Sequence, residues 1–237
     1  MSKFTLNKVN KIYSDKTYLS NNSDWHSSDS KWKTNHINYI LKKNNIYPLS
    51  VVDIGCGSGD IIYNLSLLYK KTLFHGFDVS IDAYKIAKKK TNKRIKFKIL
   101  DLKSINYKYE CLLCIDVFEH VENYLYFLKS IKNKAKYKVF HIPLDMNVTG
   151  LLKTDIIIWA RKYLGHLHYF NKNTALSTLE YCKYRIIDSY ITTPIFISNP
   201  NTFKQYLLKY LAKTVALFSK NYAAKLFPGF SLIVLAK

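Results

Sequence analysis

Three glycines and one acid are concentrated in a short segment that begins with an apolar run. In Val51-Val-Asp-Ile-Gly-Cys-Gly-Ser-Gly-Asp60 the glycines alternate with other residues, and Asp53 stands two residues before the first of them. Because glycine has no Cβ, such a loop can turn sharply and let a ligand lie against the main chain. A pyrophosphate-binding loop has the spacing G-x-G-x-x-G, whereas the spacing here is G-x-G-x-G, and Asp53 would repel a pyrophosphate. The segment therefore predicts a site for a phosphate-free ligand that carries a cationic amino group.

Acids also stand at the ends of the next three apolar runs of strand length, at Asp78, Asp101 and Asp116. Open α/β sheets bind ligands at the carboxyl ends of their parallel strands, so four carboxylates would gather at one edge. One of them can accept both hydroxyls of a ribose, and another can accept from the exocyclic amine of adenine. A simple strand-to-helix turn would not need an acid at every strand end.

On these residues the chain resembles the class I S-adenosylmethionine-dependent methyltransferase superfamily, from about Ser30 to Lys237. The resemblance implies S-adenosylmethionine as cofactor, with Asp53 near its amino group, Asp78 at its ribose and Asp101 at its adenine. The cofactor-binding residues that we expect are Asp53, Gly55, Cys56, Gly57, Gly59, Asp78, Val79, Asp101, Leu102 and Asp116. Three further stretches look like those of uncharacterised methyltransferases of bacterial polysaccharide gene clusters: Trp25-His26, Ser30-Lys-Trp32-Lys33 and Gly165-His-Leu-His-Tyr-Phe170.

Histidines close to this edge are the candidates for catalysis. Methyl transfer to a hydroxyl needs alignment of the acceptor and removal of its proton. His120 follows the fourth strand and is the first candidate base, with Glu119 to orient it; a helix-capping or packing role is the alternative. His166 and His168 have the spacing i, i+2, so in an extended segment they would point the same way.

A metal site is a further alternative, although our expectation is that none is used. Asp116, Glu119 and His120 resemble the acid-x-x-Glu-His cluster of some metal-dependent quinone and small-RNA methyltransferases, with a distant histidine completing the set. The first acid here is aspartate instead of glutamate. Cys111 and Cys114 form a CxxC inside an apolar run, without a second pair at zinc-ribbon spacing, and we interpret them as small core residues.

The order of apolar runs predicts a Rossmann-like, doubly wound α/β fold. The expected strands are residues 50–54, 72–77, 95–99, 111–115, 137–142, 185–191 and 230–236. Helical stretches separate the first five, which is typical of a parallel sheet, and the last pair suggests an antiparallel last strand. The result is a seven-stranded, mostly parallel sheet.

The domain organisation that we expect is an N-terminal lid or helical segment at residues 1–46 and a methyltransferase domain at residues 47–237. The domain would carry helical insertions at residues 148–183 and 203–226. In the second insertion one helical face carries Leu207, Leu211, Val215 and Phe218, and the opposite face carries Lys209, Lys213 and Lys220. This pattern predicts either a surface helix packed on the core or a basic amphipathic helix that touches a membrane or a lipid-linked acceptor.

The net charge of +21 comes almost entirely from lysine. A nucleic-acid or anionic-membrane partner is one explanation. A/T-rich codon usage is the other, and we favour it because arginine, which grips phosphate bidentately, occurs only three times. The sequence has no signal peptide, no run long enough to span a bilayer and too few cysteines for a disulfide scaffold, so we expect a cytoplasmic protein.

These patterns predict a methyltransferase that acts on oxygen, or less readily nitrogen, of a small-molecule or saccharide-type acceptor. An RNA methyltransferase is the first alternative, supported by the charge and the metal-like cluster; the chain has no appended RNA-binding module. A non-catalytic domain that keeps the fold as an interaction scaffold is the second.

Overall fold

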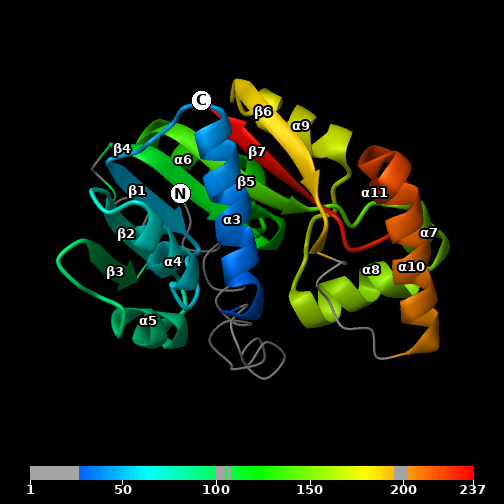
Figure 1. Cartoon of the computed structure of the whole chain (residues 1–237). Coiled ribbons are helices and arrows are strands. Elements are labelled where there is room, and N and C mark those ends of the chain that lie inside the picture. The colour runs from blue at the N-terminus through cyan, green and yellow to red at the C-terminus, as the bar shows by residue number, and fades with distance from the viewer. Residues whose placement is uncertain (1–26, 100–104, 106–107, 195–201) are drawn as a thin grey trace.

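All seven expected strands form one sheet. The computed structural model describes residues 27–99, 105, 108–194 and 202–237. The strands are β1 (Ser50–Ile54), β2 (Leu73–Asp78), β3 (Ile95–Ile99), β4 (Tyr109–Ile115), β5 (Ala135–Pro143), β6 (Ile186–Thr192) and β7 (Ser231–Ala236). Their order is β3-β2-β1-β4-β5-β7-β6, and only β7 runs antiparallel to its neighbours. The predicted fold class is therefore confirmed, and the antiparallel strand lies between β5 and β6 (Figure 1).

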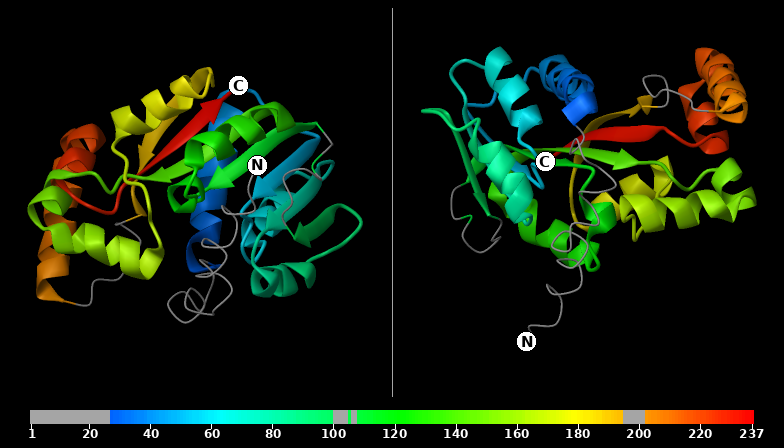
Figure 2. Two further views of the ribbon diagram at one scale, coloured as in Figure 1. Left: turned by 180° about the vertical axis from the view of Figure 1, so that it is seen from behind. Right: turned by 90° about the horizontal axis from the view of Figure 1, so that it is seen from below.

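Helices cover both faces of the sheet (Figure 2). Buried residues of α3 (Ser27–Lys43), α4 (Asp60–Leu68) and α5 (Ile81–Lys88) pack on one face. Buried residues of α6 (Tyr124–Ile131), α9 (Lys172–Tyr181), α10 (Phe203–Phe218) and α11 (Lys220–Leu226) pack on the other. Each helical layer buries apolar side chains against the sheet, which is how a doubly wound domain excludes water from two cores.

The two cysteines of the CxxC belong to different cores. Cys111 packs with the α3 and α4 side, and Cys114 with the α6 and α9 side. Successive residues of a strand face opposite ways, so positions three apart cannot share a face. Burial raises the pKa of the Cys111 thiol to about 12 and that of Cys114 well above its ordinary value. Both cysteines are core residues, as their apolar surroundings predict.

Residues 148–183, the first predicted insertion, form several short helices. They comprise α7 (Val148–Leu152), α8 (Thr154–Trp159), the π-helix η4 (Ala160–Leu164) and, after a non-helical stretch, α9. Gly165 ends the π-helix with a φ of 80°, a conformation that favours glycine. The non-helical stretch that follows carries His166 and His168 back towards the sheet.

The inserted helices all leave the sheet at its carboxyl edge. Pro143, the last residue of β5, pairs with Ser231 at the start of β7, and Thr192 at the end of β6 pairs with the same residue. The chain therefore enters α7 from this edge. It leaves β6 at the same edge, passes through α10 and α11, and returns there to begin β7. Figures 1 and 2 show α7, α8, α10 and α11 gathered at one end of the molecule, away from β3.

Among the described helices, none combines the length and the apolar character that crossing a bilayer would require.

Candidate active site

The glycine loop is held in a tight turn between β1 and α4. Gly55, Gly57 and Gly59 have φ values of 77°, 52° and 77°, which L side chains rarely adopt. A Cβ on Gly55 would come within 2.6 Å of the Val117 side chain, so the turn after β4 packs directly on this loop. The amides of Gly55 and Cys56 both donate to the carbonyl of Phe77 at the end of β2. The loop therefore makes a sharp turn at the carboxyl edge, and the absence of side chains on its glycines lets the neighbouring turn pack directly on it.

Asp78 at the end of β2 ties the loop to the next helix. Its carboxylate accepts from the Gly57 amide and the Ser80 amide, each at 2.8 Å. Burial raises the pKa of Asp78, and these backbone donors counteract the rise. Each oxygen accepts one of these bonds and can accept another, so the carboxylate retains capacity for hydroxyl donors such as those of a ribose. Val79, which follows it, is exposed.

Asp53 in β1 is buried with an incomplete set of hydrogen bonds. The residue is 1% exposed, and within the described structure its Oδ1 has no partner. Burial raises the pKa of Asp53 well above its ordinary value, and the nearby Asp78 raises it further. An unsatisfied buried carboxylate is costly, and a cationic group brought by a ligand would offset that cost.

Asp116 belongs to a network that joins three elements. Its Oδ2 pairs with Lys33 of α3 at 2.9 Å, and its Oδ1 lies 2.6 Å from Nδ1 of His141 in β5. Lys33 also pairs with Asp29, and Nε2 of His141 contacts Thr192 in β6. Burial alone would raise the pKa of Asp116, but His141 and Lys33 outweigh it and hold the pKa well below its usual range. Asp116 has a φ of 54°, so this network stabilises a backbone conformation unusual for aspartate.

Glu119 and two histidines form a second cluster beside this network. Glu119 lies in the 3-10 turn η2 (Phe118–His120), is fully buried, and has no hydrogen-bond partner on either carboxylate oxygen within the described structure. Three potential metal-ligand atoms lie within 4.8 Å of one another, one each from Glu119, His120 and His166. Nδ1 of His120 contacts the Gly165 carbonyl at 3.1 Å, and Nδ1 of His166 contacts Oδ2 of Asp145 at 2.5 Å.

These contacts settle which ring nitrogens face the carboxylate. A carbonyl can only accept, so the proton of neutral His120 resides on Nδ1 and its lone pair on Nε2. Nε2 of His120 lies 3.8 Å from Oε1 of Glu119. Asp145 favours the same tautomer of His166. Burial raises the pKa of Glu119 well above its ordinary value, and the charge of Asp116 raises it further. Lone-pair donors thus converge in a buried place, which suits a proton or a cation.

His166 and His168 do not act as a pair. The Leu167 and His168 amides both donate to the Glu119 carbonyl, which fixes this stretch beside η2. His166 points to Glu119, but the His168 ring contacts the carbonyls of Val121 and Glu122 at 3.0 and 3.2 Å. The expectation that both would point the same way is wrong, because the stretch is bent by its backbone bonds.

Asp116, bound by Lys33 and His141, also lies outside the Glu119 cluster.

Some expected residues lie outside the described structure, namely Asp101, Leu102, Trp25 and His26. Trp32 is described and packs edge-on against the rings of His36 and His141. Lys33, His141 and Asp145 are site residues that sequence reasoning missed. Lys33 lies within a helix and His141 within an apolar strand, and such positions indicate a buried polar partner because these side chains are rarely buried without one. Asp145 lies in a loop and carries no comparable signal.

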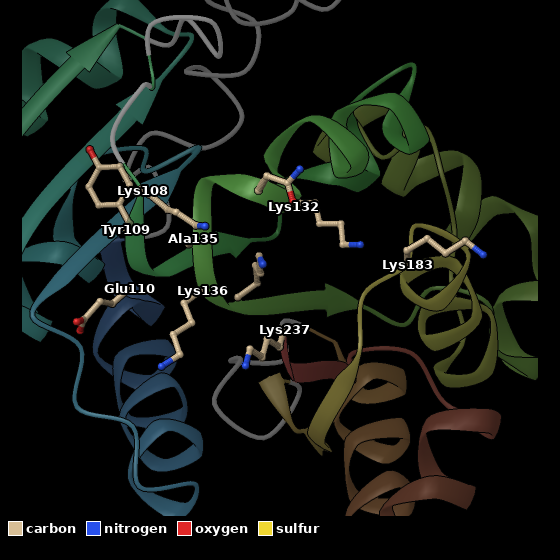
Figure 3. Close-up of a pocket in the computed structure, with 10 residues that line it drawn as sticks. Lys108, Tyr109, Glu110, Lys132, Ala135, Lys136, Lys183 and Lys237 are labelled. Carbon is tan, nitrogen blue, oxygen red and sulfur yellow. The ribbon is translucent and has the colours of Figure 1, made fainter.

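A basic concavity of about 600 Å³ lies at the opposite edge of the sheet. Figure 3 shows Lys108, Lys132, Lys136 and Lys237 around it, near the first residues of β4 and β5. Burial, together with neighbouring lysines, lowers the pKa of Lys138 in its wall to about 8. Since it lies at the amino ends of the strands, it is separate from the glycine loop and the Glu119 cluster.

Comparison with known proteins identifies the family. A profile described as "Methyltransferase domain" matches residues 25–179, more than half of the chain. The chain belongs to this methyltransferase family. It is 27% identical over 164 residues to a ubiquinone biosynthesis O-methyltransferase of Rickettsia bellii, covering 63% of this chain and 67% of that one. It is 30% identical over 193 residues to the uncharacterised protein MJ0638 of Methanocaldococcus jannaschii, covering 80% of each.

A solved structure confirms the fold of this methyltransferase. Magnesium protoporphyrin IX methyltransferase of Synechocystis PCC 6803, crystallised with bound SAH, matches with a TM-score of 0.59. The match covers 87% of this chain and 82% of the other at 17% identity. The family match together with this fold makes the protein a class I methyltransferase that depends on S-adenosylmethionine as its cofactor.

The residues at the carboxyl edge fit that cofactor. The partly unsatisfied carboxylate of Asp53 suits an ammonium group, and the carboxylate of Asp78 retains acceptor capacity for ribose hydroxyls. When bound, the cofactor supplies a methyl group already activated on a sulfonium. The protein's own part is to position the acceptor and to manage its proton.

We expect Asp78→Asn to weaken binding of S-adenosylhomocysteine by at least about tenfold in calorimetry, because charge-assisted bonds to ribose hydroxyls are worth roughly 1.5–3 kcal/mol each. Asp82→Asn on the exposed side of α5 is the matched control and should bind normally. Unchanged affinity in a folded Asp78→Asn protein would contradict the ribose assignment.

We expect Glu119→Gln to stabilise the metal-free protein at pH 7 by about 1–2 kcal/mol in urea unfolding. Folding raises the pKa of Glu119. The contribution of its neutral side chain to the free energy of unfolding is therefore complete below about pH 4.3, the ordinary pKa of glutamate, and is lost as the pH rises through the folded pKa. The advantage of the variant should therefore shrink as the pH is lowered towards 4.3. The control Glu122→Gln, on an exposed residue of the same loop, should stay within about 0.5 kcal/mol of wild type. A destabilised Glu119→Gln protein would show that the carboxylate is compensated.

Proposed function

We propose that this methyltransferase methylates a hydroxyl oxygen of a small-molecule or saccharide-type acceptor. The observation that carries the proposal is the Glu119, His120 and His166 cluster, a set of lone-pair donors beside the predicted cofactor site. The ubiquinone biosynthesis O-methyltransferase among the relatives supports oxygen as the methylated atom.

A hydroxyl acceptor needs a group that takes its proton as the oxygen attacks the methyl carbon. In the simplest mechanism Nε2 of His120 accepts that proton. The Gly165 carbonyl holds Nδ1 of His120 and so keeps the lone pair on Nε2. Glu119 would then stabilise the imidazolium that forms, since it is the nearest carboxylate to that nitrogen.

We propose that a divalent cation assists this step. A cation would satisfy the buried carboxylate of Glu119, and two histidines with one carboxylate are a common catalytic ligand set. Asp145 would act behind His166, because it fixes the tautomer that offers Nε2. The three ligand atoms lie within 4.8 Å of one another, so Glu119, His120 and His166 would hold one cation after small side-chain movements. A bound cation lowers the pKa of a coordinated hydroxyl, which would relieve His120 of the role of base.

We also propose a cytoplasmic location. All four cysteines are buried free thiols, which fits a reducing compartment.

The acceptor class is tested by incubating the purified protein with methyl-tritiated S-adenosylmethionine and three acceptor pools: hydroxylated small molecules, saccharides and total RNA. We expect label in one of the first two and in alkali-stable, ether-type products. Label confined to RNA would overturn the proposal in favour of the RNA methyltransferase.

We expect one divalent cation to bind each chain in a calorimetric titration with Mn²⁺ or Zn²⁺. His166→Ala should weaken this binding by roughly 100-fold and Asp145→Asn by roughly 10–100-fold, whereas His168→Ala should bind like wild type. Chelation should abolish methyl transfer, and added metal should restore it. Full turnover after chelation, together with loss of turnover in His120→Ala, would assign the proton transfer to His120 alone.

A further inference from the structure

Helix α10 exposes the apolar face that an ordinary surface helix would bury. Three of the four side chains predicted to share that face, Leu207, Leu211 and Phe218, are exposed, and Phe218 is 89% exposed. The fourth, Val215, contacts the core together with Ala216, and Ala212 is fully buried. The helix therefore packs on the core through Val215 and small residues, and most of its predicted apolar face stays in solvent.

The exposed side chains form one continuous surface, which we call the α10 ridge. It consists of Phe203, Tyr206, Leu207, Tyr210, Leu211, Leu217 and Phe218. At about 100° per residue these positions span an arc of about 140°, opposite the arc that packs on the core. Phe203 and Leu217 are 80% and 86% exposed, so large apolar side chains stand in water along the whole helix. Contiguous exposure of this kind marks an interaction surface.

Lysines border the ridge. Lys204 lies at one margin of the apolar arc, and Lys209 and Lys213 lie at the other. Lys220 and Lys225 follow in α11, and no Asp or Glu occurs after Asp188. An apolar stripe with basic borders and no acid complements a lipid surface with anionic headgroups better than it complements another apolar protein face.

The ridge also lies at the end of the molecule that faces the chemistry. Helices α10 and α11 join the end of β6 to the start of β7 at the carboxyl edge, the edge that holds the glycine loop and Glu119. Figure 1 shows α10 at that end of the molecule, beside α7 and α11. A bilayer against the ridge would therefore lie on the acceptor side of the protein.

We propose that the α10 ridge docks this methyltransferase on the surface of an anionic bilayer, with the helix lying in the interface. The aromatic and leucine side chains enter the boundary between headgroups and acyl chains, and the lysines bind the headgroups. Amphiphilic acceptors would then be reached without leaving the membrane surface; only this consequence rests on the proposed function.

The test is co-sedimentation of the full chain with vesicles of phosphatidylcholine alone or of phosphatidylcholine mixed with phosphatidylglycerol. We expect binding to the mixed vesicles and at least tenfold weaker binding to the neutral ones. The ridge variant Phe203→Ser/Leu217→Ser/Phe218→Ser should lose binding at least tenfold. The matched control Tyr63→Ser/Leu67→Ser/Leu68→Ser, on exposed apolar residues of α4, should bind like wild type.

A charge variant provides a second measurement that does not alter apolar residues. Each lysine near an anionic surface contributes roughly fivefold to affinity, so Lys204→Gln/Lys213→Gln should weaken binding by tenfold or more. Lys70→Gln/Lys71→Gln, on exposed lysines elsewhere, is the control.

Three results would overturn the proposal: no binding of the wild type to mixed vesicles, equal binding by ridge and control variants, or a wild-type dimer that the ridge variant converts to monomer. The last would make the ridge a contact between copies of the chain. No donor or acceptor is present in these measurements, so their failure leaves the proposed methyl transfer standing.

Discussion

Buried carboxylates at one edge of the sheet are the constraint on which the rest of the site depends. Parallel strands end together, so the buried Asp53, Asp78 and Glu119 and the partly buried Asp116 are brought to one edge of the sheet. Burying a charge is costly unless a partner compensates it. The four carboxylates differ in how far their surroundings offset that cost.

Two of the four carboxylates are compensated within the protein. Backbone amides of the glycine loop and of α5 hold Asp78, and Lys33 with His141 holds Asp116. The contacts of Asp78 fasten the glycine loop to the start of α5, and those of Asp116 fasten α3 and β5 to the turn after β4. Asp53 and Glu119 keep unsatisfied oxygens. Asp78 and Asp116 therefore stabilise the edge of the sheet, whereas Asp53 and Glu119 remain available to a cationic ligand.

The insertions extend the same edge outwards. Because α7 to α9 follow β5, and α10 and α11 precede β7, every inserted helix begins where the strands place the chemistry. The stretch after Gly165 returns His166 to Glu119, while α10 carries its apolar side chains away from the core. One insertion thus completes the Glu119 cluster, and the other presents a surface to the surroundings.

The sequence alone determined the fold class, the strands and helices, and the glycine loop with its acids, because these depend on local spacing and on the polarity of neighbouring residues. The tertiary structure decided which distant side chains meet. It joined Lys33 and His141 to Asp116, chose His166 over His168 for the Glu119 cluster, and turned the leucine face of α10 outwards. Helical or strand periodicity states which residues share a face, but whether that face packs or is exposed depends on the shape of its partner, and contacts between residues far apart in the chain leave no mark in local spacing.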